Sequence, residues 1–229
     1  MNPKENKVAV AWSGGKDSCL ACYRAINEGY NVSSLLIMMS DASISNFHLI
    51  DSKLLDDQSK SIGIPIIKKI TSPNNYEKKF KEALIELKDN GFQGLVTGDV
   101  FDVAMHEPGW LDRICNEVGL TPIKPLWHLD TKKILTQFIN NGFKAIVVRV
   151  KNSVLDTKWL GREINHQFLD ALLKQGNVDP CGEHGEFHSF VIDGPIFNNR
   201  IEITETEKTT INGYGWLKIK NYKVISKGS

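Results

Sequence analysis

The sequence has no apolar run long enough to cross a lipid bilayer. Apolar stretches such as residues 34–39 and 145–148 are far shorter than the roughly 20 residues that a transmembrane helix needs. Residues 1–7 are polar and lack the apolar core and the small-residue cleavage site of a signal peptide. We therefore expect a cytoplasmic protein without membrane contact. Its 229 residues suffice for one compact unit or two small domains.

Arginine is scarce, and the chain has almost no net charge. Only five of the 28 basic residues are arginines, and the 27 acidic residues leave a formal net charge of +1. Arginine makes bidentate contacts to phosphate, and a strong positive field is what draws a protein to nucleic acid or to a membrane. We therefore expect a small phosphorylated ligand, bound by lysine and backbone amides, and no nucleic acid partner.

Cysteine is also scarce, and its distribution argues against disulfides. The four cysteines are Cys19, Cys22, Cys115 and Cys181. In a chain without a secretory signal they do not indicate a disulfide framework. Cys19 and Cys22 form a CxxC pair one turn apart in a predicted helix. We interpret them as small residues that pack this helix, with a redox or metal site as the alternative.

The first half of the chain alternates between strand and helix character. Strands are predicted over residues 7–12, 32–38, 64–70 and 95–97, and helices over 18–28, 51–62 and 73–90. A glycine follows each of these helices. This alternation predicts an α/β fold in which a mostly parallel sheet is covered on both faces. Such sheets bind ligands beyond the carboxyl ends of their strands.

The pattern changes after about residue 119. Residues 121–127, TPIKPLW, contain two prolines that we expect to prevent regular strand pairing, so the domain boundary is placed there, with domains at 1–120 and 121–229. Farther along, the sequence predicts helices over 130–141 and 159–174 and strands over 143–150, 187–192, 200–207 and 216–225. Turns at 193–195 and 212–213 separate the last three strands. The second half therefore predicts a smaller α+β domain.

The hexapeptide SGGKDS, residues 13–18, lies between the first predicted strand and the first predicted helix. Its two glycines let backbone N–H groups approach an anion, and the following helix presents unpaired amides and the positive end of its dipole. Ser13 and Ser18 add hydroxyl groups, and Lys16 adds a mobile charge. Asp17 can hold Mg²⁺ that bridges phosphate oxygens. An ordinary capped turn is the alternative. We expect Lys16 and Asp17 to be exposed.

Residues 179–189 form a second dense segment, with glycine and proline breakers, two glutamates and two histidines before a predicted strand. Glu183 and Glu186 can bind a trimethylammonium group or an ammonia nucleophile by charge, and His188 can accept a proton from the attacking amine. A solvated acidic turn is the alternative. A zinc site is a rival interpretation, although a fourth ligand with suitable spacing is not evident. Its ligands would be Cys181, His184 and His188.

The hexapeptide resembles the PP-loop of the ATP pyrophosphatases, which cleave ATP between its α and β phosphates. Other segments are similar to the diphthine-ammonia ligase branch of that family: Phe47-His48, Gln58, Gly63-Ile64-Pro65, Thr97-Gly98-Asp99-Val100, Pro125-Leu126-Trp127, Trp159-Leu160-Gly161 and residues 181–188, CGEHGEFH. The resemblance covers roughly residues 7–197. It implies an adenine nucleotide alpha hydrolase-like nucleotide-binding domain, followed by a second domain that helps to enclose the substrate.

The same resemblance implies the reaction and the site. In that branch ATP activates the carboxylate of diphthine, a modified histidine of elongation factor 2, and ammonia displaces AMP to form the amide. The implied cofactors are ATP and Mg²⁺, and the implied partners are ATP, ammonia and elongation factor 2. The expected ATP-binding residues are Ser13, Gly14, Gly15, Lys16, Asp17, Ser18, Met38, Gly98 and Asp99. The expected catalytic residues are Lys16, Asp17, Glu186 and His188, the substrate contacts are Glu183, Glu186 and His188, and the metal ligand is Asp17.

Other functions stay open. Residues 103–109 replace a charged, arginine-containing segment of the relatives, so a different small-molecule carboxylate is an alternative substrate. A tRNA-modifying PP-loop enzyme would need an extended basic face, which the composition disfavours. A nucleotide-binding protein without catalysis is a further class. The roles of His48 and His106, and assembly into a homodimer, are open as well.

Overall fold

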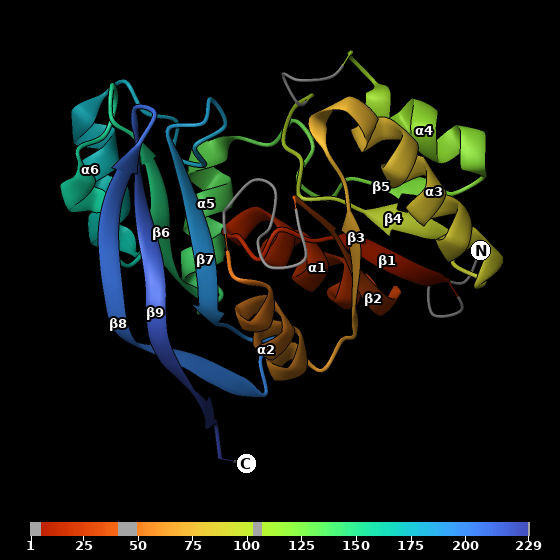
Figure 1. Cartoon of the computed structure of the whole chain (residues 1–229), viewed down its shortest axis with the longest axis horizontal. Coiled ribbons are helices and arrows are strands. Elements are labelled where there is room, and N and C mark those ends of the chain that lie inside the picture. Colours follow the sequence, from red (N-terminus) through yellow and green to blue (C-terminus); the bar gives the residue numbers. More distant parts are fainter. Residues whose placement is uncertain (1–5, 41–49, 103–106, 229) are drawn as a thin grey trace. The chain divides into compact units, whose positions relative to one another are not determined.

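The computed structural model of the chain describes residues 6–40, 50–102 and 107–228 (Figure 1). Contacts within the chain divide it into two compact units. The first consists of Met1–Ser13, Asp17–Lys60 and Ile64–His128, and the second of Gly14–Lys16, Ser61–Gly63 and Leu129–Ser229. His48 and His106, whose roles the sequence left open, lie outside the described residues.

The first unit is built on a five-stranded parallel sheet. Its strands are β1 (Lys7–Ala11), β2 (Asn31–Met39), β3 (Ile66–Ile70), β4 (Gly94–Val96) and β5 (Thr121–Ile123), in the order β3-β2-β1-β4-β5. Its helices are α1 (Lys16–Asn27), α2 (Ser52–Ile62), α3 (Tyr76–Asp89) and α4 (Trp110–Val118), with a short 3₁₀ helix η2 (Pro73–Asn75) before α3. The predicted α/β class is confirmed. Strand order reverses between β1 and β4, so their carboxyl ends mark the topological switch point where such sheets bind ligands.

Local sequence explains where these helices end and which face they bury. At the start of α2, Asp51 Oδ1 accepts a hydrogen bond from the backbone N–H of Lys53 at 2.8 Å, and Gly63, with φ of +81°, follows the helix. Burial of a whole Leu or Phe side chain contributes roughly 1.5–3 kcal/mol, so the apolar face of α3 is a main source of its stability. The buried residues of this face are Phe80, Ala83, Leu84 and Leu87, which belong to a core cluster shared with α4 and the sheet.

Strand β5 corrects one expectation from the sequence. Residues Thr121–Ile123 pair in parallel with β4, with Pro122 opposite Leu95, although we expected the prolines of this segment to prevent pairing. Because β5 is the edge of the sheet, one of its sides needs no hydrogen-bond partner, and an edge strand tolerates the missing N–H of proline. The compact unit that holds β5 extends to His128, whereas the sequence placed the boundary after residue 120.

The second unit contains a four-stranded antiparallel sheet. Its strands are β6 (Lys144–Lys151), β7 (Phe187–Asp193), β8 (Asn199–Ile211) and β9 (Tyr214–Ser226), in the order β7-β6-β9-β8, and β8 and β9 form a long hairpin in Figure 1. Its helices are α5 (Thr131–Asn140) and α6 (His166–Gln175), with the 3₁₀ helix η3 (Thr157–Trp159). The hairpin turns at Asn212 and Gly213, which have φ of +51° and +80°. Positive φ at both positions is the pattern that an Asn-Gly hairpin turn predicts.

The helix predicted over residues 159–174 is shorter than expected. It is replaced by η3 and α6, which are separated by a segment in which Gly161 has φ of +82° and Glu163 bridges to Ile146 of β6. Asn165 then caps α6 by accepting a hydrogen bond from Phe168 N at 3.0 Å. The positive φ of Gly161 and the N-cap at Asn165 thus interrupt the helix that the apolar periodicity predicts. Within the described residues, no helix has the length and apolar character needed to cross a membrane.

Candidate functional site

The loop of residues 13–18 connects β1 to α1, as the sequence predicts. Gly14 has φ of +77°, which a residue with a side chain rarely adopts, so this position uses the freedom of glycine. The hydroxyl groups of Ser13 and Ser18 lie 3.1 Å apart, and Ser18 Oγ accepts the Ser13 N–H at 3.4 Å. These contacts close the loop over the first turn of α1. The glycine-rich turn and the helix N-terminus are thus joined in the manner of an anion-binding loop.

Gly98 brings the end of β4 against this loop. A Cβ atom at Gly98 would lie 2.6 Å from the carbonyl carbon of Asp17 and 2.7 Å from the nitrogen of Ser18, so only glycine fits. The adjacent Asp99 is therefore held close to Asp17. Burial raises the pKa of the Asp99 carboxyl, and the charge of Asp17 raises it further, while a hydrogen bond to Thr97 opposes both. Among the residues expected to bind ATP, the structure places four close to one another: Asp17, Ser18, Gly98 and Asp99.

Met38, another expected nucleotide contact, has a different environment. It lies near the carboxyl end of β2, is 6% exposed, and belongs to the core cluster that includes Phe80 and Leu84. The side chain therefore packs in this core, and its contact with the nucleotide stays a prediction.

Lys16 is buried, although its place in a glycine-rich loop predicted an exposed side chain. Its side chain donates a hydrogen bond from Nζ to the carbonyl oxygen of Cys181, and its backbone N–H donates to Ser189 Oγ at 3.1 Å. Nζ also lies 5.1 Å from the ring centre of Phe187. Only 4% of the residue is accessible to solvent. The expected exposure is wrong because residues distant in sequence cover the lysine; Asp17 is partly buried as well.

Glu186 organises the loop of residues 179–189. It is 4% exposed, and its two carboxylate oxygens accept backbone N–H groups from Asp179 at 3.0 Å and His184 at 2.9 Å. Asp179 in turn accepts the N–H groups of Cys181 at 2.8 Å and Glu183 at 3.3 Å. Charge-assisted hydrogen bonds of this kind are stronger than neutral ones. The two carboxylates therefore hold the backbone that presents the Cys181 carbonyl to Lys16.

His188 contacts Arg149, an arginine that belongs to none of the motifs described above. His188 lies in β7 opposite Arg149 of β6, and His188 Nε2 is 2.9 Å from Arg149 Nη1. Because a guanidinium group only donates, Nε2 accepts, and the ring proton is assigned to Nδ1. Arg149 also stacks on Tyr214 and Trp216, with its Cζ atom 4.0 and 4.8 Å from the ring centres. The available signal was an arginine between two valines of a mainly apolar strand.

The zinc alternative and the CxxC alternative find no support in the described part of the chain. No group of three His, Cys, Asp or Glu side chains there has the geometry of a metal site. Cys19 and Cys22 are unbridged and fully buried in α1. Burial raises the pKa of Cys22 to about 12, which leaves its thiol protonated and unreactive. Their predicted packing role is confirmed.

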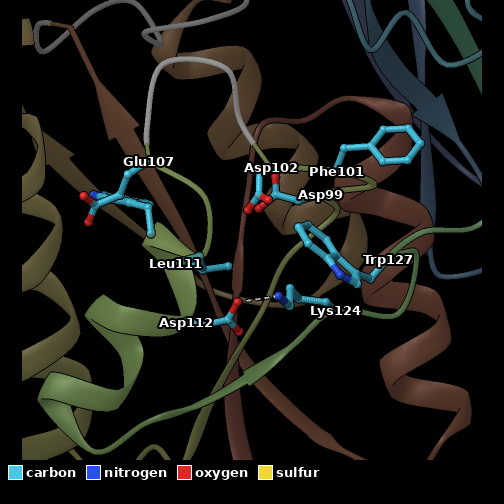
Figure 2. A pocket seen from close by; sticks show the side chains of 9 residues that line it. Asp99, Phe101, Asp102, Glu107, Leu111, Asp112, Lys124 and Trp127 are labelled. Atoms are coloured by element: carbon cyan, nitrogen blue, oxygen red, sulfur yellow. Dashed lines mark hydrogen bonds and ion pairs between the residues drawn. The ribbon is translucent and has the colours of Figure 1, made fainter.

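A pocket in the first unit lies beyond the ends of β4 and β5 (Figure 2). It is lined by Asp99, Phe101, Asp102, Glu107, Trp110, Leu111, Asp112, Lys124 and Trp127. Figure 2 shows Asp99 and Asp102 together at one end, Trp127 along one side, and Lys124 paired with Asp112 at the other end, at 2.6 Å. Asp99 belongs both to this pocket and to the surroundings of Asp17. No motif in the sequence indicates this pocket, because its lining comes from separate segments.

Comparison with known proteins identifies relatives along most of the chain. The diphthamide synthase N-terminal domain model matches residues 6–122, and the diphthamide synthase C-terminal domain model matches residues 130–225. A diphthine–ammonia ligase of Mus musculus is 25% identical over 226 residues, which cover 88% of this chain and 84% of the relative. One from Schizosaccharomyces pombe is 27% identical over 233 residues, covering 88% of this chain and 36% of that longer protein.

Among solved structures, one described as a predicted subunit of tRNA methyltransferase from Methanocaldococcus jannaschii is 20% identical, with a TM-score of 0.49. That match covers 83% of this chain and 98% of the other. The assignment therefore rests on the two domain models, which together account for most of the sequence. The chain belongs to the diphthamide synthase family.

Proposed function

We propose that the chain is an ATP-dependent ligase that joins ammonia to the carboxylate of diphthine on elongation factor 2 and releases AMP and pyrophosphate. The observation that carries this proposal is the SGGKDS loop, which lies between β1 and α1 at the topological switch point of a parallel sheet. Membership of the diphthamide synthase family supports it, as do the relatives named diphthine–ammonia ligase.

The proposed reaction has two steps because a carboxylate would have to expel oxide to react directly with ammonia. In the first step a carboxylate oxygen attacks the α phosphorus of ATP, and the bond from that phosphorus to the bridging oxygen breaks, releasing pyrophosphate. In the second, ammonia attacks the acyl carbon, the bond to the AMP oxygen breaks, and the nitrogen loses a proton. Neither step needs a nucleophilic side chain, so the protein's task is to position the reactants and stabilise charge.

Lys16 would change partners when the nucleotide binds. Its Nζ now donates to the neutral carbonyl of Cys181. Phosphate oxygens are charged acceptors, and hydrogen bonds between two charged groups are about twice as strong as neutral ones. We therefore propose that the Lys16 side chain leaves the carbonyl and binds the triphosphate, while the amides of Gly14 and Gly15 contact the same phosphates.

Asp17 fits the role of a Mg²⁺ ligand. Its carboxylate lies in the first turn of α1, directly after Lys16 of the loop. Proteins commonly hold Mg²⁺ through one or two carboxylates together with substrate phosphates and water, which matches a single carboxylate at a phosphate loop. When bound, the ion would neutralise charge on the phosphate oxygens.

The residues of the 179–189 loop would divide their tasks. Both carboxylate oxygens of Glu186 accept hydrogen bonds from backbone N–H groups. We therefore propose that Glu186 shapes the loop and takes no part in bond making. Glu183 remains the proposed contact for a positively charged reactant. His188 already accepts a hydrogen bond at Nε2, so it can take up a proton there only if Arg149 moves away.

The test is a reconstituted reaction. The chain is incubated with ATP, ammonium and the organism's diphthine-bearing elongation factor 2, and the amide is detected by mass spectrometry together with AMP and pyrophosphate. We expect Lys16→Met and Asp17→Asn to lower AMP formation by about 100-fold or more, since each removes charge stabilisation from the transferring phosphate. Lys16→Met keeps an unbranched side chain that lacks only the terminal nitrogen position, and thermal unfolding checks that both variants fold.

Lys218→Ala is the matched control, because Lys218 is an exposed lysine on β9. Unchanged AMP formation in both loop variants would contradict the proposed site. If AMP forms with a different carboxylate or with tRNA, the proposed ATP site stands and the proposed substrate is wrong. ATP binding without AMP, whichever acceptor is supplied, would leave a nucleotide-binding protein without catalysis.

A further inference from the structure

The antiparallel sheet of the second unit carries a positive charge that no negative charge balances. Arg149 of β6 forms no ion pair with any carboxylate that the structure describes. Its polar side-chain contacts are with His188 and Tyr214, and both of these groups are neutral. A guanidinium group keeps its charge in proteins, and this one is only partly exposed. Because a charge removed from water is costly unless it is paired, the position favours a bound anion.

Two buried donors belong to the same cluster. Arg149 Nε and Trp216 Nε1 are both buried, and neither has a hydrogen-bond partner within the described part of the chain. Each of these nitrogens can only donate. The Arg149 Cζ atom lies 4.8 Å from the ring centre of Trp216, so the two residues are in contact. Buried donors without an acceptor are unfavourable and rare in native proteins, and the oxygen atoms of an anion would satisfy both.

The neighbours of Arg149 fix the orientation of its guanidinium group. Its Cζ atom lies 4.0 Å from the ring centre of Tyr214, and ring contacts of this kind hold the charged group in place. Its Nη1 atom is 2.9 Å from His188 Nε2, which accepts the hydrogen bond. The edge of the guanidinium group that contains Nε is therefore the one left for two parallel hydrogen bonds to an oxyanion.

This cluster is separate from the loop of residues 13–18. Phe187 and Ser189, which flank His188 in β7, both contact Lys16 of that loop. Successive residues of a strand point to opposite faces of a sheet, so His188 and its cross-strand neighbour Arg149 lie on the other face. A nucleotide bound at the loop would not account for the buried donors of the cluster.

We propose that Arg149 and Trp216 form a binding site for a small oxyanion, a carboxylate or a phosphate group, on this face of the antiparallel sheet. The inference does not depend on the proposed function. The oxygens of the ligand accept hydrogen bonds from the Nε edge of Arg149 and from the indole N–H of Trp216, while Tyr214 and His188 hold the guanidinium group. These side chains are partly exposed, and such side chains change rotamer within nanoseconds, so a small ligand can reach the donors.

The test follows the indole N–H signals of the isotope-labelled full chain by NMR. The Trp216 signal is the one that Trp216→Phe removes. Sodium phosphate and, separately, sodium acetate are titrated at an ionic strength held constant with sodium chloride. Either anion should move this signal downfield in a saturable way, because a hydrogen bond to an anion deshields the proton.

Variants of Arg149 measure its part in binding. We expect Arg149→Gln to weaken the affinity read from the Trp216 signal by about tenfold or more, since charge-assisted hydrogen bonds are lost. Arg149→Lys keeps the charge and loses the planar fork, so it should weaken affinity by about threefold. Arg200→Gln, which replaces an exposed arginine of β8, is the matched control and should leave affinity unchanged. Circular dichroism checks that each variant folds, and Arg149→Lys decides the question if Arg149→Gln does not.

The two titrations distinguish the sources of the oxyanion. Tighter binding of phosphate assigns a phosphorylated ligand, and tighter binding of acetate assigns a carboxylate ligand. The proposal would be overturned if neither anion moved the Trp216 signal, or if the Arg149 variants bound the anions as tightly as the wild type. Because the signal comes from Trp216 alone, phosphate bound at the loop of residues 13–18 does not enter the measurement.

Discussion

At the scale of single residues, Gly98 has little freedom to change, because an added Cβ atom would meet backbone atoms. Its missing side chain is what allows the end of β4 to touch the Asp17 and Ser18 backbone. We expect Gly98→Ala to lower the free energy of unfolding by about 1–3 kcal/mol, because the strand must move away from the loop. ATP affinity should fall with it, since the loop amides shift. Both quantities can be measured, by chemical denaturation and by nucleotide titration.

Gly91→Ala provides the comparison for that variant. Gly91 has φ of +80°, so alanine there is strained, but an added Cβ would meet no atom within 4 Å. We expect Gly91→Ala to lower the free energy of unfolding by about 1 kcal/mol and to leave ATP affinity unchanged. A Gly98→Ala protein as stable as Gly91→Ala, with normal ATP affinity, would contradict the close approach.

Asp99 should make stability depend on pH. Burial raises its pKa above the ordinary value of 3.8, so the folded chain holds the proton more tightly than the unfolded chain does. The stabilisation from the protonated acid is present below the unfolded pKa and is lost as pH rises through the raised folded pKa. Asp99→Asn should therefore raise Tm at pH 7, and the gain should shrink toward acid pH.

Thermal unfolding from about pH 4 to pH 8 would measure this dependence. Asp89→Asn, at an exposed position, serves as the control and should show no such trend. A lower Tm for Asp99→Asn at pH 7 would mean that the ionised carboxylate stabilises the fold. A gain in stability with a loss of activity would instead mark Asp99 as a group kept for function.

At the scale of helices and strands, short-range signals determine the ends of elements. Asp130 caps α5 by accepting a hydrogen bond from Lys133 N at 2.8 Å. Asp130→Ala should lower the free energy of unfolding by about 1 kcal/mol, which lowers Tm by roughly 2–4 °C in a chain of this size. Asp130→Asn keeps an oxygen acceptor and should lose much less. Equal losses in the two variants, measured by calorimetry, would show that the cap contributes nothing.

The same scale shows where sequence patterns mislead. Prolines at residues 122 and 125 suggested an unpaired domain boundary, yet residues 121–123 form an edge strand, because an edge has one free side. The helix predicted over 159–174 is longer than the observed one, because the apolar spacing continues across Gly161, whose φ is positive. Propensity describes which secondary structure a residue prefers. The position of a strand in its sheet and the sign of φ at a residue also depend on neighbours that are distant in sequence.

At the scale of the whole molecule, the charge balance sets the partners that the chain can attract. With a net charge of +1 and five arginines, it can neutralise few phosphates at once. We expect no binding to tRNA at about 150 mM salt in a filter-binding assay, because non-specific affinity of that kind depends on releasing many counterions. Micromolar binding that weakens steeply with added salt would contradict this expectation and favour the tRNA-modifying alternative.

The sequence by itself determined the features that depend on neighbouring residues. Alternating periodicity predicted the parallel and antiparallel halves, Asn212-Gly213 predicted the hairpin turn, and the SGGKDS hexapeptide predicted the glycine-rich turn between β1 and α1. Each is governed by backbone conformation or by burial along a single segment, so local residues suffice to specify it.

Only the tertiary structure decided which side chains meet. It buried Lys16 against Cys181, turned both oxygens of Glu186 toward the backbone, paired His188 with Arg149, and gathered the lining of the pocket. These contacts join residues from different elements, and their geometry follows from how the strands and helices pack. No pattern along the chain encodes such distances, because packing fits the shapes and charges of many side chains at once.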